Sequence, residues 1–70
     1  MRKFKIGDIV EFDPTNVNRT LNPVGTRKLL GIRFNVDRIS SVYGKYFYCD
    51  INDGDLILDM VSEKLLKIRG

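Results

Sequence analysis

The amino-acid sequence predicts a small all-β domain, because one stretch has the pattern of a β-hairpin and others alternate apolar and polar residues. In residues 46–58, Asp53-Gly54 is a dipeptide typical of a two-residue type I′ turn. This turn would place Ile51 opposite Leu56 and Cys49 opposite Leu58. One face of the hairpin then carries only apolar side chains, those of Phe47, Cys49, Ile51, Leu56, Leu58 and Met60. Turn chemistry and apolar pattern therefore select the same register.

A first strand is expected in residues 3–12, entered through a bend at Gly7-Asp8. Its core candidates are Phe4, Ile6, Val10 and Phe12. Asp13-Pro14 ends this strand, because proline has no N–H to donate to a neighbouring strand. Residues 13–31 then form a connection that is long for so small a domain, which indicates either a functional loop or a hidden element.

One short helix is expected within this connection. Asn22 would cap it, Pro23 would take its first position, and Gly31 would end it. The stretch 29–32 is equally compatible with the start of a strand, so the sequence leaves both alternatives open.

A second strand is expected in residues 32–40, with a bulge near Asp37-Arg38 that returns Ile39 to the core. Gly44 suits the turn that follows, because glycine readily adopts a positive φ. The third strand begins at Tyr46 and leads into the hairpin.

The C-terminal residues predict a helical turn and a closing strand. Ser62 would cap a single helical or 3₁₀ turn. Residues 66–69 would form a last strand, with Leu66 and Ile68 facing inward. Pairing of this strand with the first would remove two exposed edges of the sheet.

The length of 70 residues corresponds to one domain, and 43% apolar with 30% charged residues is typical of a globular chain that folds alone. The single cysteine, Cys49, cannot form an internal disulfide, and we expect it to be a buried apolar residue and not a reactive thiol. The first residues lack the apolar stretch of a signal peptide, and no segment is long and apolar enough to cross a bilayer. We therefore expect a cytoplasmic protein without membrane association.

Three motifs together resemble those of the small SH3-like β-barrels. The first strand carries Phe4, Ile6, Gly7, Asp8 and Val10, the third strand and its turn carry Tyr46, Tyr48 and Asp53-Gly54, and the last strand carries Leu65, Leu66, Lys67 and Ile68. The resemblance implies a five-stranded SH3-like barrel with a long first loop and one 3₁₀ turn before the last strand. It finds no counterpart for residues 13–31.

Stand-alone barrels of this kind are frequent among small bacterial and bacteriophage proteins, and the related KOW domains bind RNA, ribosomes or RNA polymerase. Peptide-binding SH3 domains are a poorer match, because this chain has no tryptophan and no acidic motif in its long loop.

The clearest functional pattern is a basic segment in residues 14–36, which contains no carboxylate. Its four cations are Arg19, Arg27, Lys28 and Arg33. Guanidinium and ammonium groups bind phosphate oxygens, so this pattern favours nucleic acid or another polyanion. A second interpretation is that the segment binds an acidic protein surface. A third is that it is a solvated loop whose cations offset the five carboxylates of residues 50–63.

Two outward tyrosines, Tyr46 and Tyr48, are further candidates for partner binding, with Tyr43 in the preceding turn. Tyrosine also suits half-buried strand positions without any function. The acids expected on the same face are Asp50, Asp55 and Asp59. They would repel phosphate, so protein contact is the better expectation for these tyrosines.

Catalytic and metal-binding patterns are missing from the sequence. It has no histidine and no glycine-rich phosphate loop after a strand. The acidic stretch from Asp50 departs from a calcium loop, because its sixth and twelfth positions are Asp55 and Val61. We expect no cofactor, no metal and no enzymatic activity.

The sequence therefore predicts a non-catalytic binding module that contacts nucleic acid or a nucleoprotein complex through its basic loop. The alternative is a protein-interaction module, a phage or bacterial accessory protein that modulates or inhibits a host protein. Either would act as a monomer or a weak homodimer.

Overall fold

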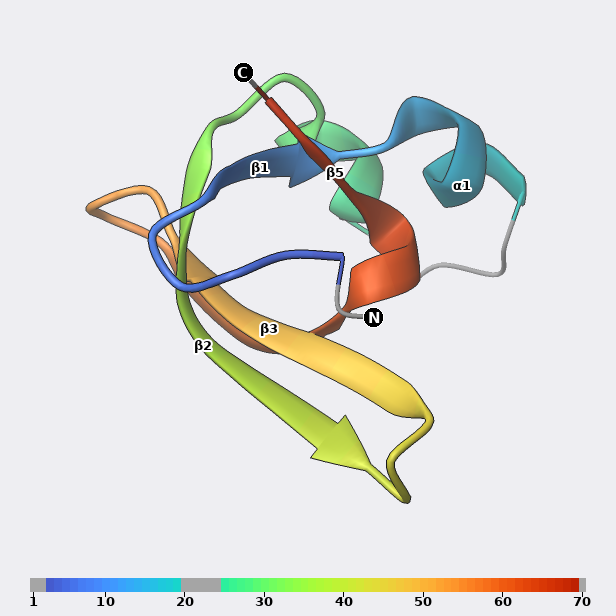
Figure 1. The fold of residues 1–70 in the computed structure, drawn as a ribbon. Helices are drawn as coiled ribbons and strands as arrows, with labels where there is room; N and C mark the ends of the chain where they lie inside the picture. Colours follow the sequence, from blue (N-terminus) through green and yellow to red (C-terminus); the bar gives the residue numbers. More distant parts are fainter. Residues whose placement is uncertain (1–2, 20–24, 70) are drawn as a thin grey trace.

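Five antiparallel strands form a single sheet in the order β4-β3-β2-β1-β5 (Figure 1). The strands are β1 (Ile9–Phe12), β2 (Phe34–Val42), β3 (Tyr46–Asn52), β4 (Ile57–Ser62) and β5 (Leu66–Ile68). An α-helix, α1 (Pro14–Arg19), and a 3₁₀ helix, η1 (Thr26–Leu29), follow β1, and a second 3₁₀ helix, η2 (Glu63–Leu65), connects β4 to β5. The structure, a computed structural model, describes residues 3–19 and 25–69.

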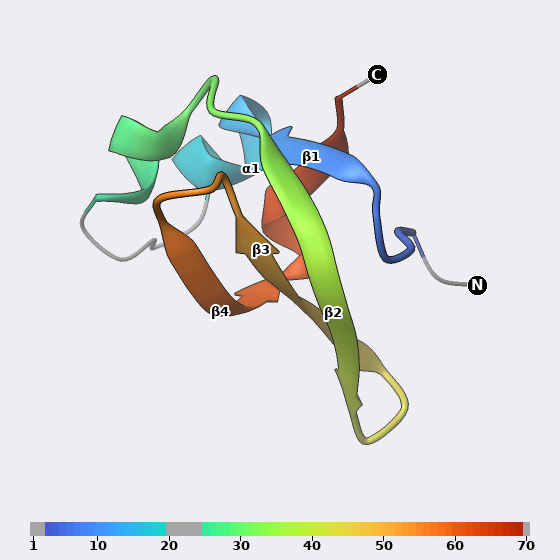
Figure 2. The same ribbon diagram turned by 90° about the vertical axis from the view of Figure 1, so that its left-hand side faces the viewer.

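The sheet is strongly bent, and the β2–β3 hairpin projects from the rest of the domain (Figures 1 and 2). The strands β4 and β5 lie at the two ends of the strand order and form no ladder with each other in the described parts of the chain. The structure thus shows a small all-β domain with an open five-stranded sheet. None of its described helices is long and apolar enough to cross a membrane.

The hydrophobic core lies inside the bend of the sheet. Its buried residues are Phe4, Val10, Phe12, Val17, Phe34, Val36, Cys49, Ile51 and Leu66. The rings of Phe12 and Phe34 pack edge to face, with centroids 5.8 Å apart. Val17 brings α1 onto this core and is fully buried, so the long connection contributes to stability.

Two expected core residues outside the β3–β4 hairpin are exposed. Ile6 is 68% exposed because residues 5–8 form a turn, in which the Asp8 N–H donates to the Lys5 carbonyl and Gly7 has φ 94°. The first strand consequently begins only at Ile9. Ile68 is 50% exposed, because it ends the short edge strand β5 at the rim of the core.

The hairpin of β3 and β4 exists, but its predicted register is wrong. Ile51 pairs with Leu58 and not with Leu56, and Cys49 pairs with Val61 beyond a bulge. The Asp53 N–H donates to the Leu56 carbonyl, which centres the turn on Gly54-Asp55. As a result, Leu56 and Met60 are 37% and 51% exposed instead of buried.

The Asp53 side chain explains the shifted turn. Its Oδ1 accepts hydrogen bonds from the backbone N–H groups of Leu56, at 2.7 Å, and Asp55, at 3.0 Å. These bonds favour the ionised carboxylate and lower the pKa of Asp53. A side-chain acceptor thus replaces the main-chain acceptor that a two-residue turn at Asp53-Gly54 would use.

The described part of the long connection, residues 13–19 and 25–31, contains two helices where one was expected. Asp13 caps α1, since its Oδ1 accepts a 3.0 Å hydrogen bond from the Thr15 N–H, and Pro14 takes the first helical position. The second, η1, covers part of the expected helix. Asn22 and Pro23, the expected cap and first residue, lie outside the described residues. No strand begins in residues 29–32, because β2 starts at Phe34.

Several other predictions are confirmed. The register of β2 and β3 shifts between Val36 and Arg38, which is the expected bulge, and Ile39 packs against the core. Gly44 has φ 65° in the β2–β3 turn. The Ser62 hydroxyl accepts from the Lys64 N–H at the start of η2, and β5 pairs with β1.

Candidate functional site

An apolar groove of about 580 Å³ opens on the surface of the described residues. It lies between η1 and β4, which face each other in Figure 2. Its lining residues are Phe12, Gly25, Thr26, Leu29, Tyr48, Leu56, Leu58, Asp59, Met60, Val61, Ser62 and Leu65. We call it the η1–β4 groove.

The bulge in β4 shapes one wall of the η1–β4 groove. Met60 has φ 54° and a half-exposed side chain, while Val61 takes the inward position opposite Cys49. Across the groove, Leu29 of η1 packs against the core with part of its surface uncovered. A lining of this kind binds apolar side chains of a ligand, because their burial removes water from both surfaces.

Two of the four predicted basic residues lie beside this groove. Arg27 and Lys28 are exposed on η1, between the lining residues Thr26 and Leu29. Arg33 is exposed just before β2, and Arg19 ends α1 with its side chain outside the described part. Within the described residues, Arg27, Lys28 and Arg33 form no ion pair. Their charges are thus available to a partner.

The two predicted tyrosines share a second, smaller hollow, and Tyr48 lines the η1–β4 groove as well. Tyr48 is half-buried and lines the η1–β4 groove together with Ser62, its partner across the β3–β4 ladder. Tyr46 is 51% exposed and lines only the second, smaller hollow. Tyr43, in the β2–β3 turn, is 88% exposed.

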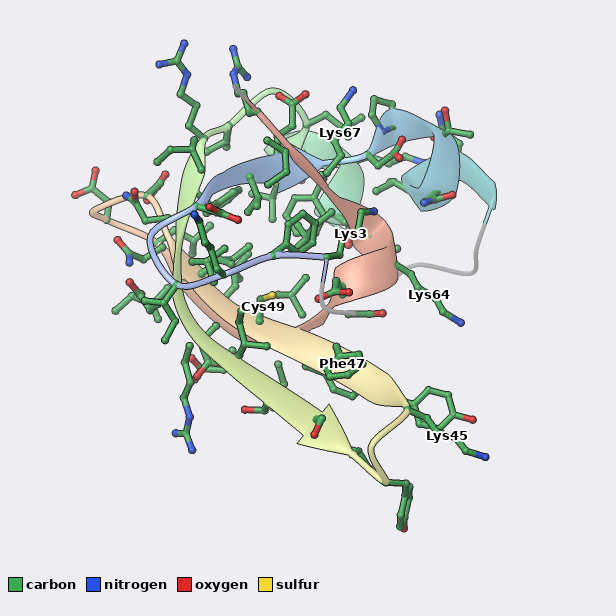
Figure 3. The ribbon with its side chains drawn as sticks, in the orientation of Figure 1. Lys3, Lys45, Phe47, Cys49, Lys64 and Lys67 are labelled. Atoms are coloured by element: carbon green, nitrogen blue, oxygen red, sulfur yellow. The ribbon has the colours of Figure 1, made fainter. Side chains whose placement is uncertain are left out.

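The smaller hollow, of about 140 Å³, lies between the start of β3 and η2. Its lining residues are Lys45, Tyr46, Phe47, Tyr48, Ser62, Glu63 and Lys64. Figure 3 shows Lys45 and Lys64 extending on the same side of the molecule. Glu63 is part-buried, and its Oε2 has no hydrogen-bond partner. We call this feature the η2 hollow.

Cys49 lies inside the sheet and is fully buried. Burial raises the pKa of its thiol from 9.0 to about 11, and the nearby carboxylates of Glu63 and Asp50 add to the shift. A thiol of this kind stays protonated near neutral pH, so it packs as a small apolar group, as expected from the sequence.

Acidic residues do not combine into a metal site in residues 3–19 and 25–69, where no three Cys, Asp or Glu side chains are placed to hold an ion. Asp50 and Asp59, expected to share a face with the tyrosines, have separate environments. Asp50 accepts from the Met60 N–H, and Asp59 lines the η1–β4 groove.

The sequence did not reveal either hollow. The groove depends on a bulge that turns Met60 outward, and the pairing pattern alone predicted Met60 as buried. The η2 hollow depends on the end of β4. This strand ends at Ser62, opposite Tyr48, so β4 does not flank the start of β3. Comparison of the chain with protein-family models, with curated proteins and with solved structures gives no match.

Proposed function

We propose that this chain is a non-catalytic binding module that holds a short apolar segment of a partner protein in the η1–β4 groove. The observation that carries this proposal is an apolar surface, concave and partly open, whose walls come from the long connection and from the edge strand β4. Concave apolar surfaces on small domains are typical of ligand and protein contacts. The role as a modulator or inhibitor of a host protein is one form that such binding would take.

The charges beside the groove indicate which orientation a bound partner segment would take. Arg27 and Lys28 are exposed on the η1 side, and the exposed carboxylate of Asp59 is on the β4 side. A partner segment with acidic residues toward η1 and a basic residue toward β4 would match both walls. Such complementary charges fix the orientation of a partner more than they raise its affinity.

The fold itself is proposed to be an SH3-like barrel. Two features support the proposal: the strand order with β5 beside β1, and the 3₁₀ helix η2 directly before β5. The helix α1 in the long first connection has no counterpart in the motifs that carry the resemblance.

A photo-crosslinking amino acid placed at position 60 tests the groove directly. Met60 lines the groove and is 51% exposed, whereas Ile57, on the same strand, is 68% exposed and is not part of the lining. Position 60 should crosslink to one partner protein in nuclease-treated lysate of the cells that produce the chain, and position 57 should not. Equal crosslinking at both positions would show that the groove is not the surface that contacts the partner.

A second candidate function is binding of nucleic acid or a nucleoprotein complex through the basic segment. The favouring observation is the exposure of Arg27, Lys28 and Arg33 without an ion pair to any described carboxylate. Four phosphate contacts, with Arg19 as the fourth, would give a slope of log affinity against log salt of about −2.8 to −3.6. No retardation of DNA or RNA at about 50 mM salt would exclude this candidate.

A further inference from the structure

The projecting tip of the β2–β3 hairpin has an unusual turn. Tyr43 and Gly44 both have positive φ, 56° and 65°, and the Lys45 N–H donates to the Val42 carbonyl across them. Positive φ at both central residues is the pattern of a type I′ turn, for which Asn-Gly is the favoured dipeptide. Tyr43 therefore occupies a position that suits asparagine, and a strained residue in an exposed turn points to a role for its side chain.

The same tip carries exposed aromatic rings next to cations. Tyr43 and Tyr46 are 88% and 51% exposed, with Lys45 between them in the sequence. Residues 39–49, which include the tip, contain one cation, Lys45, and no carboxylate. Across the η2 hollow, Lys64 extends on the same side as Lys45 (Figure 3). The tip and η2 thus combine stacking surfaces with positive charge.

We propose that the tip and the η2 hollow bind single-stranded nucleic acid, with bases stacked on Tyr43 and Tyr46 and phosphates at Lys45 and Lys64. Aromatic side chains beside a basic groove are the usual means of binding single strands, since every unpaired base offers a face for stacking. A duplex keeps its bases stacked on each other and would use only the lysines. This inference does not depend on the η1–β4 groove, and it places nucleic acid on other residues than Arg27, Lys28 and Arg33.

The acidic residues of the hairpin do not oppose this proposal. Tyr46 is the first residue of β3, Asp50 lies four residues further along this strand and accepts from the Met60 N–H, and Asp59 lines the η1–β4 groove. Asp53 and Asp55 follow the C-terminal end of β3. A strand of that length spans about 20 Å, which is roughly twice the screening length in physiological salt. Glu63 is the one carboxylate among the residues that line the η2 hollow, and the two lysines there exceed its charge. The site is therefore positive where the phosphates would lie.

The test is the affinity for a labelled oligothymidylate of about 15 nucleotides, near the upper site size of small single-strand binders, at about 50 mM salt. Tyr46→Ala should weaken binding by about tenfold, and Tyr46→Phe should keep the affinity because the ring remains. Replacing both Lys45 and Lys64 by alanine should weaken binding by about tenfold or more and reduce the salt slope by about 1.4. Both lysines make their turn hydrogen bonds through the backbone, so these variants keep those bonds.

Replacement of both Arg27 and Lys28 by alanine is the matched control, because it removes the same charge from another surface. The affinity of this control should stay within about threefold of that of the unmodified chain, because the two removed charges are distant from the site and screened by salt. Three results would each overturn the proposal: no binding of the single strand, binding of a matching duplex at least as tight, or a larger loss in the control than in the lysine variant. Ile57→Asp, which adds one carboxylate at an exposed position that lines neither hollow, should leave this affinity unchanged.

Discussion

The carboxylate of Asp50 accepts a 2.9 Å hydrogen bond from the backbone N–H of Met60 on the facing strand. This bond lies at the bulge where the register of β3 and β4 shifts between Cys49 and Ile51. Met60 has φ 54° there, so its side chain points outward and lines the η1–β4 groove. A polar contact within the sheet thus determines where the groove wall is placed.

Asp50→Ala should lower the free energy of unfolding by about 1 kcal/mol, because the bulged N–H loses its protein acceptor. Asp50→Asn keeps an acceptor oxygen and should lose less. Urea unfolding of the three proteins measures the difference. Equal stability of the Ala variant and the unmodified chain would show that the bulge does not depend on this bond.

Tyr43→Asn should raise the free energy of unfolding by about 0.5 to 1 kcal/mol, because asparagine tolerates the positive φ that tyrosine adopts at a cost. The same substitution should weaken the binding of single-stranded nucleic acid, since a stacking ring is lost. Thermal unfolding and the oligothymidylate assay check the two effects on one protein. A variant that is more stable and binds the oligothymidylate equally well would show that Tyr43 does not contribute to the proposed site.

The Cys49 thiol should make stability depend on pH in the alkaline range. Its pKa is raised from 9.0 to about 11 in the folded chain, so the folded state favours the neutral thiol. The resulting stabilisation is complete below pH 9 and is lost as the pH rises from 9 to 11, by about 2 kcal/mol.

Cys49→Ala is the control for that measurement, because lysines and tyrosines also titrate in this range. Its free energy of unfolding should be lower than that of the unmodified chain at pH 8, with a difference that shrinks toward pH 11. A constant difference would contradict the raised pKa. Slow reaction of the folded thiol with a disulfide reagent at pH 8 is a second check.

Asp13→Ala should destabilise the domain by about 1 kcal/mol, because Asp13 caps α1. The helix has only six residues, and it brings Val17 into the core. Asp13→Ser offers another capping oxygen and should restore most of the loss. Chemical unfolding followed by far-ultraviolet circular dichroism measures both, and an unaffected Ala variant would show that α1 is held by packing alone.

Local patterns in the sequence predicted much of the sheet. The bulge in β2, the positive φ at Gly44 and the cap at Ser62 each follow from one or two residues with a strong local preference. The pairing of β5 with β1 follows from the need to cover two exposed edges of the sheet. The existence of the β3–β4 hairpin follows from the same kind of pattern.

The parts that the sequence did not predict depend on competing local bonds. Asp53-Gly54 is a common type I′ dipeptide, but the Asp53 carboxylate binds two backbone N–H groups and moves the turn by one residue. Turn geometry of the I′ kind occurs instead at Tyr43-Gly44, which sequence preference would not select. Asp13-Pro14 predicts the end of a strand, and the same pair also begins the helix α1.

The predicted site residues are divided by the fold. Arg27 and Lys28 lie at the η1–β4 groove, Tyr46 lies at the η2 hollow, and Tyr48 lines both. Lys45 and Lys64 are isolated cations in the sequence, and only the return of the chain through η2 brings them to one hollow. Charge runs along the sequence therefore do not locate the surfaces on which their side chains gather.

The most direct measurement of the central claim is capture of a partner protein from nuclease-treated lysate by the unmodified chain, Met60→Asp and Ile57→Asp. Both substitutions place one carboxylate at an exposed apolar position of β4, and only Met60 lines the η1–β4 groove. The account predicts that Met60→Asp loses the partner while Ile57→Asp retains it. Retention by Met60→Asp, or equal loss by both, would contradict it.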